Sequence, residues 1–160
     1  MELGNYLMKQ KEVIEQCVKC FKLLEAKQGI DLKDFFEAGN KKNYKLFSDI
    51  KKKGLYAFYD GKHIVYIGKG GDSETRLLKE RILQELHYDG NGDTGATLSK
   101  NIRSRVNGHC INSETEFYEY IRNWKLKVVD YNDDELLVSL DLVEAFCIEL
   151  FETRKFLNIK

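Results

Sequence analysis

The side chains best suited to chemistry in this sequence are two tyrosines, the basic residues that follow them, and one late glutamate: Tyr56, Tyr66, Lys69, Arg76, Arg81 and Glu144. Neighbouring phenols followed by a glycine-rich run with a lysine, and then by a basic helix, suggest a surface that binds phosphate. The glutamate interrupts an otherwise apolar helical face, and a carboxylate in such a place needs a partner. An arginine would pair with it as a structural salt bridge, whereas a bound cation would use it as a ligand.

The tyrosines can act together only if a hairpin places them on one face of a sheet. Residues 54–70 read as two short strands joined at Asp60-Gly61, and an Asp-Gly pair between β-prone runs is a strong hairpin signal. A two-residue loop would send the tyrosines to opposite faces. A three-residue loop ending at Lys62 is favoured, because it sets Tyr56 opposite Tyr66 and leaves the other face uniformly apolar. The expected faces are Tyr56, Phe58, Ile64 and Tyr66 on one side and Leu55, Ala57, Val65 and Ile67 on the other.

These strands also resemble a known pair of motifs. Gly54-Leu55-Tyr56 followed by Tyr66-Ile67-Gly68 is similar to the paired motif of the GIY-YIG nuclease family. The family places an arginine on the next helix, where residues 78–86 of this chain read Leu-Lys-Glu-Arg-Ile-Leu-Gln-Glu-Leu. It also has a metal-binding glutamate on a late helix that ends near a Leu-Asn pair, matched here by Glu144 and Leu157-Asn158. The resemblance spans residues 54–158.

Three features depart from the family's usual pattern. The stretch between the two motif tyrosines is slightly shorter than usual. Glu85 stands where the family often has a histidine, and His87 follows two residues later. Arg76 lies at a spacing from the second motif that many members use, so Arg76 and Arg81 are both candidates for the family's arginine.

The resemblance implies an α+β fold in which helices flank a small antiparallel sheet of three strands. Residues 1–53 would form an N-terminal helical extension, and residues 54–160 would form the nuclease-like domain. Helical periodicity predicts the remaining elements. They are helices over 2–27, within 30–53, from Asp72 to about 87, from Thr97 onward, over 114–123 and over 134–155, and a strand over 124–131.

The implied activity is Mg²⁺-dependent hydrolysis of phosphodiester bonds in DNA by an endonuclease. By resemblance, Glu144 would bind the divalent cation and Tyr56 would act as general base towards water. Arg81 would bind a phosphate oxygen, and Tyr66 would orient Tyr56 or the phosphate. A phenol has an ordinary pKa of about 10. Its phenolate would therefore depend on nearby positive charge from Mg²⁺, Arg81 and Lys69.

Contacts with the nucleic acid are expected from residues that lie in or near these motifs. The helix that begins near Thr97 could present its N-terminal amides to a phosphate, although a plain solvated loop before it explains the same residues equally well. The expected substrate-binding residues are Gly68, Lys100, Arg103 and Asn158.

A different class of function fits the same residues: a catalytically weak or inactive module that binds nucleic acid or protein. Glu85 in the place of the frequent histidine favours that alternative. The presence of Tyr56, Arg81 and Glu144 together favours cleavage. The sequence leaves open the target, the choice of DNA or RNA, the role in restriction, mobile elements, phage defence or repair, and the oligomeric state, for which a dimer is one option.

Length and composition fit one cytoplasmic domain. The chain has 160 residues, of which 42% are hydrophobic, with 26 basic and 26 acidic side chains. The absence of a long apolar run and of a signal-peptide pattern predicts a soluble protein with no membrane partner. Cys17 and Cys20 could form half a zinc site with His109-Cys110. However, cysteines three residues apart in an apolar helical stripe are more often core residues.

Overall fold

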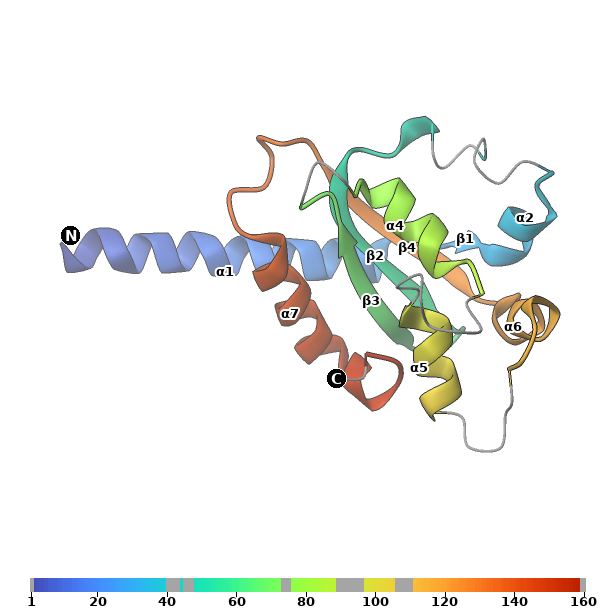
Figure 1. Cartoon of the computed structure of the whole chain (residues 1–160). Helices are drawn as coiled ribbons and strands as arrows, with labels where there is room; N and C mark the ends of the chain where they lie inside the picture. The colour runs from blue at the N-terminus through green and yellow to red at the C-terminus, as the bar shows by residue number, and fades with distance from the viewer. Residues whose placement is uncertain are drawn as a thin grey trace.

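The computed structural model describes residues 2–39, 44, 48–72, 76–88, 97–105 and 111–158, and it has an α+β fold (Figure 1). Its antiparallel sheet has four strands in the order β1-β4-β2-β3. The strands are β1 (Ile30–Asp31), β2 (Lys53–Tyr59), β3 (Ile64–Gly70) and β4 (Lys125–Tyr131). The predicted α+β class and antiparallel sheet are confirmed. The predicted count of three strands is wrong, because β1 adds a short fourth strand along β4.

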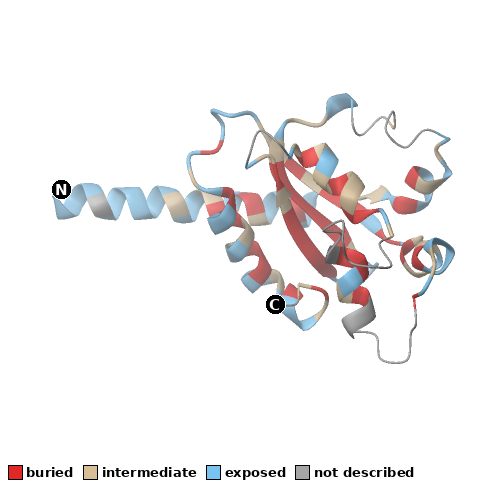
Figure 2. Ribbon diagram, viewed as in Figure 1, coloured by how far each residue is buried: buried red, intermediate tan, exposed pale blue. Residues whose placement is uncertain are grey.

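Helices cover both faces of the sheet. One face, which carries the tyrosines, packs against α2, α4, α5 and α6, and the opposite face packs against α1 and α7. The strands at the centre are buried almost throughout (Figure 2). The helices are α1 (Leu3–Ala26), α2 (Leu32–Glu37), α4 (Leu78–Glu85), α5 (Thr97–Arg105), α6 (Glu114–Ile121) and α7 (Leu140–Phe151), followed by the 3-10 helix η2 (Thr153–Lys155). Within the described residues, no helix is both long and apolar enough to cross a membrane.

The β2–β3 hairpin forms where the sequence predicts it, but its register differs. Tyr56 lies opposite Gly68, and Phe58 lies opposite Tyr66. The prediction that Tyr56 faces Tyr66 directly is therefore wrong by two residues. A longer turn accounts for one of these residues, because Tyr59 pairs with Ile64, and a β-bulge at Val65 accounts for the other. In the turn, the Asp60 carboxylate accepts hydrogen bonds from the backbone N–H groups of residues 62 and 63 at 2.9 and 2.8 Å. Such an Asx turn stabilises a loop over residues 60–63 in place of the predicted three-residue loop.

A β-bulge changes the facing of two residues. The pairing shifts between Phe58 and Tyr59, which leaves Val65 as the extra residue of β3. Val65 consequently packs on the tyrosine face and Ile64 on the opposite face, the reverse of the prediction. The other assignments are confirmed: Tyr56, Phe58 and Tyr66 share one cluster, and Leu55, Ala57 and Ile67 share the other.

Two helices begin later than predicted. The last helix begins at Leu140 instead of residue 134, because Ser139 is its N-cap and accepts a hydrogen bond from the backbone N–H of Asp141 at 3.1 Å. Leu137, which lies within the predicted helix but before α7, is 78% exposed. The helix after the hairpin begins at Leu78. Asp72, its predicted cap, instead forms an ion pair with Lys69.

Candidate active site

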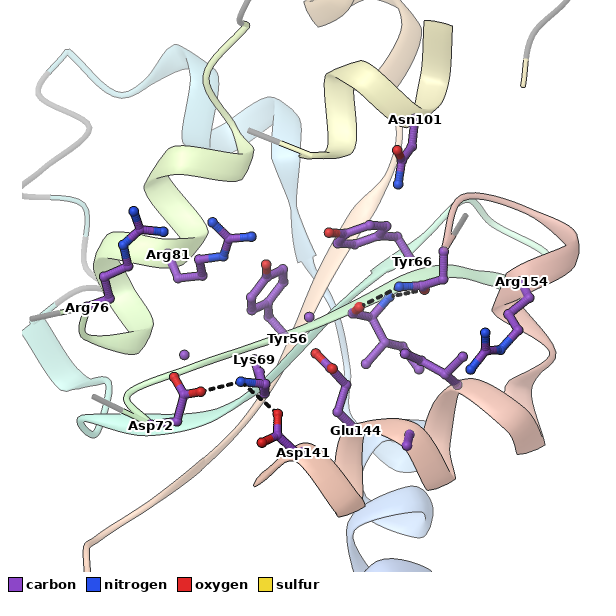
Figure 3. A pocket seen from close by; sticks show the side chains of 16 residues that line it. Tyr56, Tyr66, Lys69, Asp72, Arg76, Arg81, Asn101, Asp141, Glu144 and Arg154 are labelled. Atoms are coloured by element: carbon purple, nitrogen blue, oxygen red, sulfur yellow. Dashed lines mark hydrogen bonds and ion pairs between the residues drawn. The ribbon is translucent and has the colours of Figure 1, made fainter. Parts of the chain in front are cut away.

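A cleft of about 610 Å³ opens between β3, α4, α5 and α7 (Figure 3). It is lined by every residue for which the sequence suggested chemistry: Tyr56, Tyr66, Lys69, Arg76, Arg81 and Glu144. Apart from Arg76, which lies between β3 and α4, these side chains come from the central hairpin, from α4 on its tyrosine face, and from α7 on the opposite face. The fold therefore brings together groups that are far apart in the sequence.

The two tyrosines are diagonal neighbours on the sheet. Their ring centroids lie 6.3 Å apart, and the ring planes are tilted by 31°. Tyr56 has no exposed surface, and Tyr66 is 6% exposed. Figure 3 shows the Tyr56 hydroxyl pointing towards Arg81. Within the described residues, however, no group meets this hydroxyl with hydrogen-bonding geometry.

Burial decides the protonation of Tyr56. Desolvation raises the pKa of the phenol well above its ordinary value, and the negative charge of Glu85 and the neighbouring Tyr66 raise it further. Arg81 acts in the opposite direction and lowers the pKa, but it does not offset the burial. The protein alone thus keeps Tyr56 protonated at neutral pH.

The Arg81 guanidinium is held by two residues of its own helix. One terminal nitrogen, Nη1, donates to Oε1 of Gln84 at 2.6 Å, and Nη2 lies 3.9 Å from Oε1 of Glu85. Glu85 is completely buried, and its carboxylate faces the arginine. Arg76 also lines the cleft but is exposed. Of the two candidate arginines, Arg81 is therefore the one that the fold orients beside Tyr56.

Lys69, near the end of β3, forms an ion pair with a residue in the first turn of α7. Its ammonium group pairs with the carboxylate of Asp72 and, at 3.0 Å, with that of Asp141. Burial lowers the pKa of Lys69, but the hydrogen bonds to the two carboxylates outweigh it, so the pKa is raised. The lysine is thus charged, and its charge is already paired with two carboxylates.

Several residues that line the cleft were missed by the sequence reasoning. Asp141 precedes Glu144 by three residues, and residues at that spacing lie side by side on a helix. This spacing was a usable signal. Asp72 follows Lys69 by three residues and pairs with it. Asn101 and Arg154 carried no such local signal, because segments remote in sequence bring them to the cleft. The missed polar residues are Asp72, Asn101, Asp141 and Arg154.

Gly68 makes room for the ring of Tyr56. A Cβ atom at this position would lie 2.2 Å from both Cζ and Oη of Tyr56. The ring therefore lies directly over the glycine, its partner across the two strands. Gly68 was predicted to contact substrate, and the structure shows that it also has a steric role in placing the tyrosine.

Replacing Gly68 by alanine should displace the Tyr56 ring. Forcing a methyl group into this contact is expected to lower the free energy of unfolding by about 1–3 kcal/mol. Urea denaturation of the purified variant measures the change. Gly39→Ala is the matched control, because a Cβ there would meet nothing within 4 Å. Equal stability of Gly68→Ala and wild type would mean that the ring does not lie over the glycine.

The Asn158 side chain forms hydrogen bonds with the backbone of β3, the strand at one edge of the sheet. Its side-chain Oδ1 accepts a hydrogen bond from the backbone N–H of Ile67 at 2.7 Å, and its Nδ2 donates to the Ile67 carbonyl at 2.8 Å. The backbone N–H of Leu157 donates to the Val65 carbonyl at 3.0 Å. Asn101 secures the segment by donating to the Leu157 carbonyl at 2.7 Å. Asn158 was predicted to contact substrate, and here its amide is used to hold the C-terminal segment on β3.

The other two predicted substrate contacts lie in α5. Lys100 is exposed and is not among the described residues that line the cleft. The side chain of Arg103 lies outside the described residues. Neither residue adds to the cleft as the structure describes it.

Glu144 is the cleft's candidate metal ligand. It is half-buried on α7, and its carboxylate points into the cleft (Figure 3). Mg²⁺ binds through one or two carboxylates and keeps several waters, so Glu144 alone supplies the minimum donor set. Asp141, on the same helix, has its carboxylate paired with Lys69 at 3.0 Å. The described residues contain no group of three or more His, Cys, Asp or Glu side chains that could hold a metal ion. A Mg²⁺ site of this kind needs no such group, so the oxygen donors present fit it.

The cysteines of α1 behave as core residues. Cys17 and Cys20 are buried free thiols in the cluster between α1, α7 and the sheet, which is the alternative that the sequence favoured over zinc. His109 and Cys110, the other half of the possible zinc site, lie outside the described residues.

Comparisons of the chain with protein-family models, with curated proteins and with solved structures gave no match. The geometry and chemistry of the cleft, with the side chains that line it, are therefore the basis from which its function is inferred.

Proposed function

We propose that this protein is a Mg²⁺-dependent endonuclease that hydrolyses phosphodiester bonds in DNA. The observation that carries the proposal is the cleft in which Tyr56, Arg81 and Glu144 lie together. Hydrolysis of a phosphodiester requires a base for the attacking water and stabilisation of negative charge on the phosphate oxygens. A phenol, a guanidinium and a carboxylate able to hold a cation correspond to those requirements.

Each side chain has a distinct role in this proposal. Glu144 would hold the Mg²⁺ ion, which when bound supplies positive charge at the phosphate and the leaving oxygen. Arg81 would bind a non-bridging phosphate oxygen, because Gln84 and Glu85 hold its guanidinium in place. Tyr56 would accept the proton of the attacking water at its phenolate oxygen, and Tyr66 would orient Tyr56 or the phosphate.

The same cleft supports a second candidate function, a domain that binds nucleic acid without cutting it. The observation that favours it is the complete burial of Tyr56, which raises the pKa of the phenol and opposes its use as a base. Glu85, where the related family often has a histidine, favours it as well. Lys69, Arg76 and Arg81 would serve binding in either case.

Incubation with nucleic acid tests the proposal against this alternative. Supercoiled plasmid, linear duplex, single-stranded DNA and RNA are each incubated with the protein in Mg²⁺ or in a chelator. Nicked or linear plasmid in Mg²⁺, and intact plasmid in the chelator, is the expected result. Intact substrates throughout, combined with binding measured by fluorescence anisotropy, would assign the non-cutting function.

The two arginines should differ in their importance for cleavage. Arg81→Ala is expected to reduce the single-turnover rate by two or more orders of magnitude, about 3 kcal/mol of transition-state stabilisation. Arg76→Ala should have a much smaller effect, because Arg76 is exposed and Arg81 is held beside Tyr56. Rates measured at saturating protein make the comparison. The reverse ranking would transfer the phosphate-binding role to Arg76.

A further inference from the structure

The N-terminal half of α1 extends beyond the rest of the protein (Figure 1). The residues described in this part, 2–5 and 7–12, are all exposed (Figure 2). The C-terminal half is anchored, because Cys17, Cys20 and Leu24 are buried against α7 and the sheet. The helix thus continues for several turns without cover from the domain.

This extension carries an exposed apolar stripe. Leu3, Leu7 and Ile14 are 70%, 54% and 57% exposed, and Val18 is half-buried. These four residues, here called the α1 stripe, follow one another at spacings that place them on one side of a helix. A shallow groove on α1 continues the stripe towards the anchored end and includes Ile14, Val18, Leu23 and Ala26 in its lining. An apolar face on a helix of this kind gains most of its stability by packing against another element.

We propose that the α1 stripe binds the α1 stripe of a second copy of this chain in an antiparallel helix pair. The stripe is self-complementary when two copies run in opposite directions about a centre between Gln10 and Lys11. Leu3 then lies opposite Val18 of the second copy, and Leu7 lies opposite Ile14. A twofold axis repeats both contacts, so each copy uses the same surface, as symmetric dimers do. The inference does not rest on the proposed nuclease function.

The position of the domain on α1 favours the antiparallel direction. The body packs on the C-terminal half of the helix, so antiparallel pairing places the two bodies at opposite ends. Parallel pairing would bring both domains to the same end of the helix pair, where they would clash sterically.

The charges beside the centre of the stripe are paired within each copy. Lys11 lies beside the centre of the stripe and pairs with Glu15 at 3.9 Å. The twofold axis would bring the two lysines side by side, and the glutamate paired with each lysine offsets their repulsion. The chain carries no net charge that would hold two copies apart. A stripe of this size is smaller than the ~800 Å² per partner of a standard interface, so the dimer should be weak, with a micromolar dissociation constant.

Sedimentation equilibrium of the full chain tests the dimer. Wild type should change from monomer to dimer as the concentration rises to tens of micromolar. Leu7→Glu and Ile14→Glu should each weaken association at least tenfold without unfolding the protein, because both residues are exposed in the monomer. Leu142→Glu, at an exposed leucine of α7 outside the stripe, is the matched control and should associate like wild type. A wild type that stays monomeric, or a Leu7→Glu variant that associates normally, would overturn the proposal.

Cysteine cross-linking tests the direction of the pair. In an antiparallel dimer, Leu7→Cys protein mixed with Ile14→Cys protein should form a disulfide-linked dimer under a mild oxidant such as oxidised glutathione. Each variant alone should form far less. Equal cross-linking by each variant alone would indicate a parallel pair and would contradict the antiparallel arrangement.

Discussion

A Tyr56→Phe protein should be at least as stable as wild type and yet lose DNA cleavage. The Tyr56 hydroxyl is buried and, within the described residues, has no hydrogen-bond partner. Removing a buried polar group that makes no hydrogen bond costs nothing and can raise the free energy of unfolding, by about 1 kcal/mol. The ring contacts with Phe58 and Tyr66, at centroid distances of 6.0 and 6.3 Å, are kept by phenylalanine.

Loss of the general base should lower the single-turnover cleavage rate by about 10²–10⁴-fold. Urea denaturation and cleavage of labelled duplex measure the two effects on the same protein. Tyr59→Phe is the matched control, because the Tyr59 hydroxyl donates to the Gly61 carbonyl in the turn, away from the cleft. Full activity in Tyr56→Phe would remove Tyr56 from the chemistry.

The pH dependence of cleavage should identify the same group. Because burial raises the pKa of Tyr56 well above its ordinary value, only a small fraction is phenolate at neutral pH. That fraction increases about tenfold per pH unit below the pKa. The single-turnover rate should therefore rise with pH between about 7 and 9. The residual rate of Tyr56→Phe should not rise in this way, and a flat wild-type profile would assign the proton transfer to another group.

A Glu144→Ala protein should lose cleavage and keep its affinity for DNA. The substitution removes the carboxylate that would hold Mg²⁺ and is expected to lower the rate at least a thousandfold, about 4 kcal/mol. Lys69, Arg76 and Arg81 stay in the cleft, so binding of the phosphate backbone should persist or become slightly tighter.

Three measurements separate these effects: cleavage, fluorescence anisotropy with labelled duplex, and calorimetry with Mg²⁺ or Mn²⁺. Calorimetry should show loss of the metal-binding signal in the variant. Glu119→Ala serves as the control, because Glu119 is exposed on α6 and pairs with Arg122 at 3.3 Å, and neither is among the described residues that line the cleft. Normal turnover by Glu144→Ala would exclude Glu144 from the metal site.

Sequence periodicity was enough to place Tyr56 and Tyr66 on one face of a β-hairpin. Side chains alternate along a strand with a period of two, so a register error of two residues changes the partners of these tyrosines but keeps both on the same face. For the same reason Tyr56 and Phe58 were assigned correctly although their cross-strand partners were not. Helical periodicity likewise located α1, because its repeat extends over many residues.

Details that depend on single side chains were not predictable from periodicity. The Asp60 carboxylate sets the length of the turn, and the bulge at Val65 reverses the facing of Val65 and Ile64. Ser139 decides where α7 begins. The β1 strand has only two residues, too few to show an alternating pattern. It forms because its backbone pairs with β4 at the edge of the sheet.

The arrangement of the cleft depends on packing between distant parts of the chain. Lys69 and Asp141 meet across a long stretch of sequence, as do Asn158 and Ile67. No local spacing reports such contacts, because they arise when α7 and the C-terminal segment pack on the sheet. The complete burial of Tyr56 has the same origin, since the clusters that enclose it draw on helices from the whole chain. The sequence therefore identified the chemical groups, and packing determined their protonation and their partners.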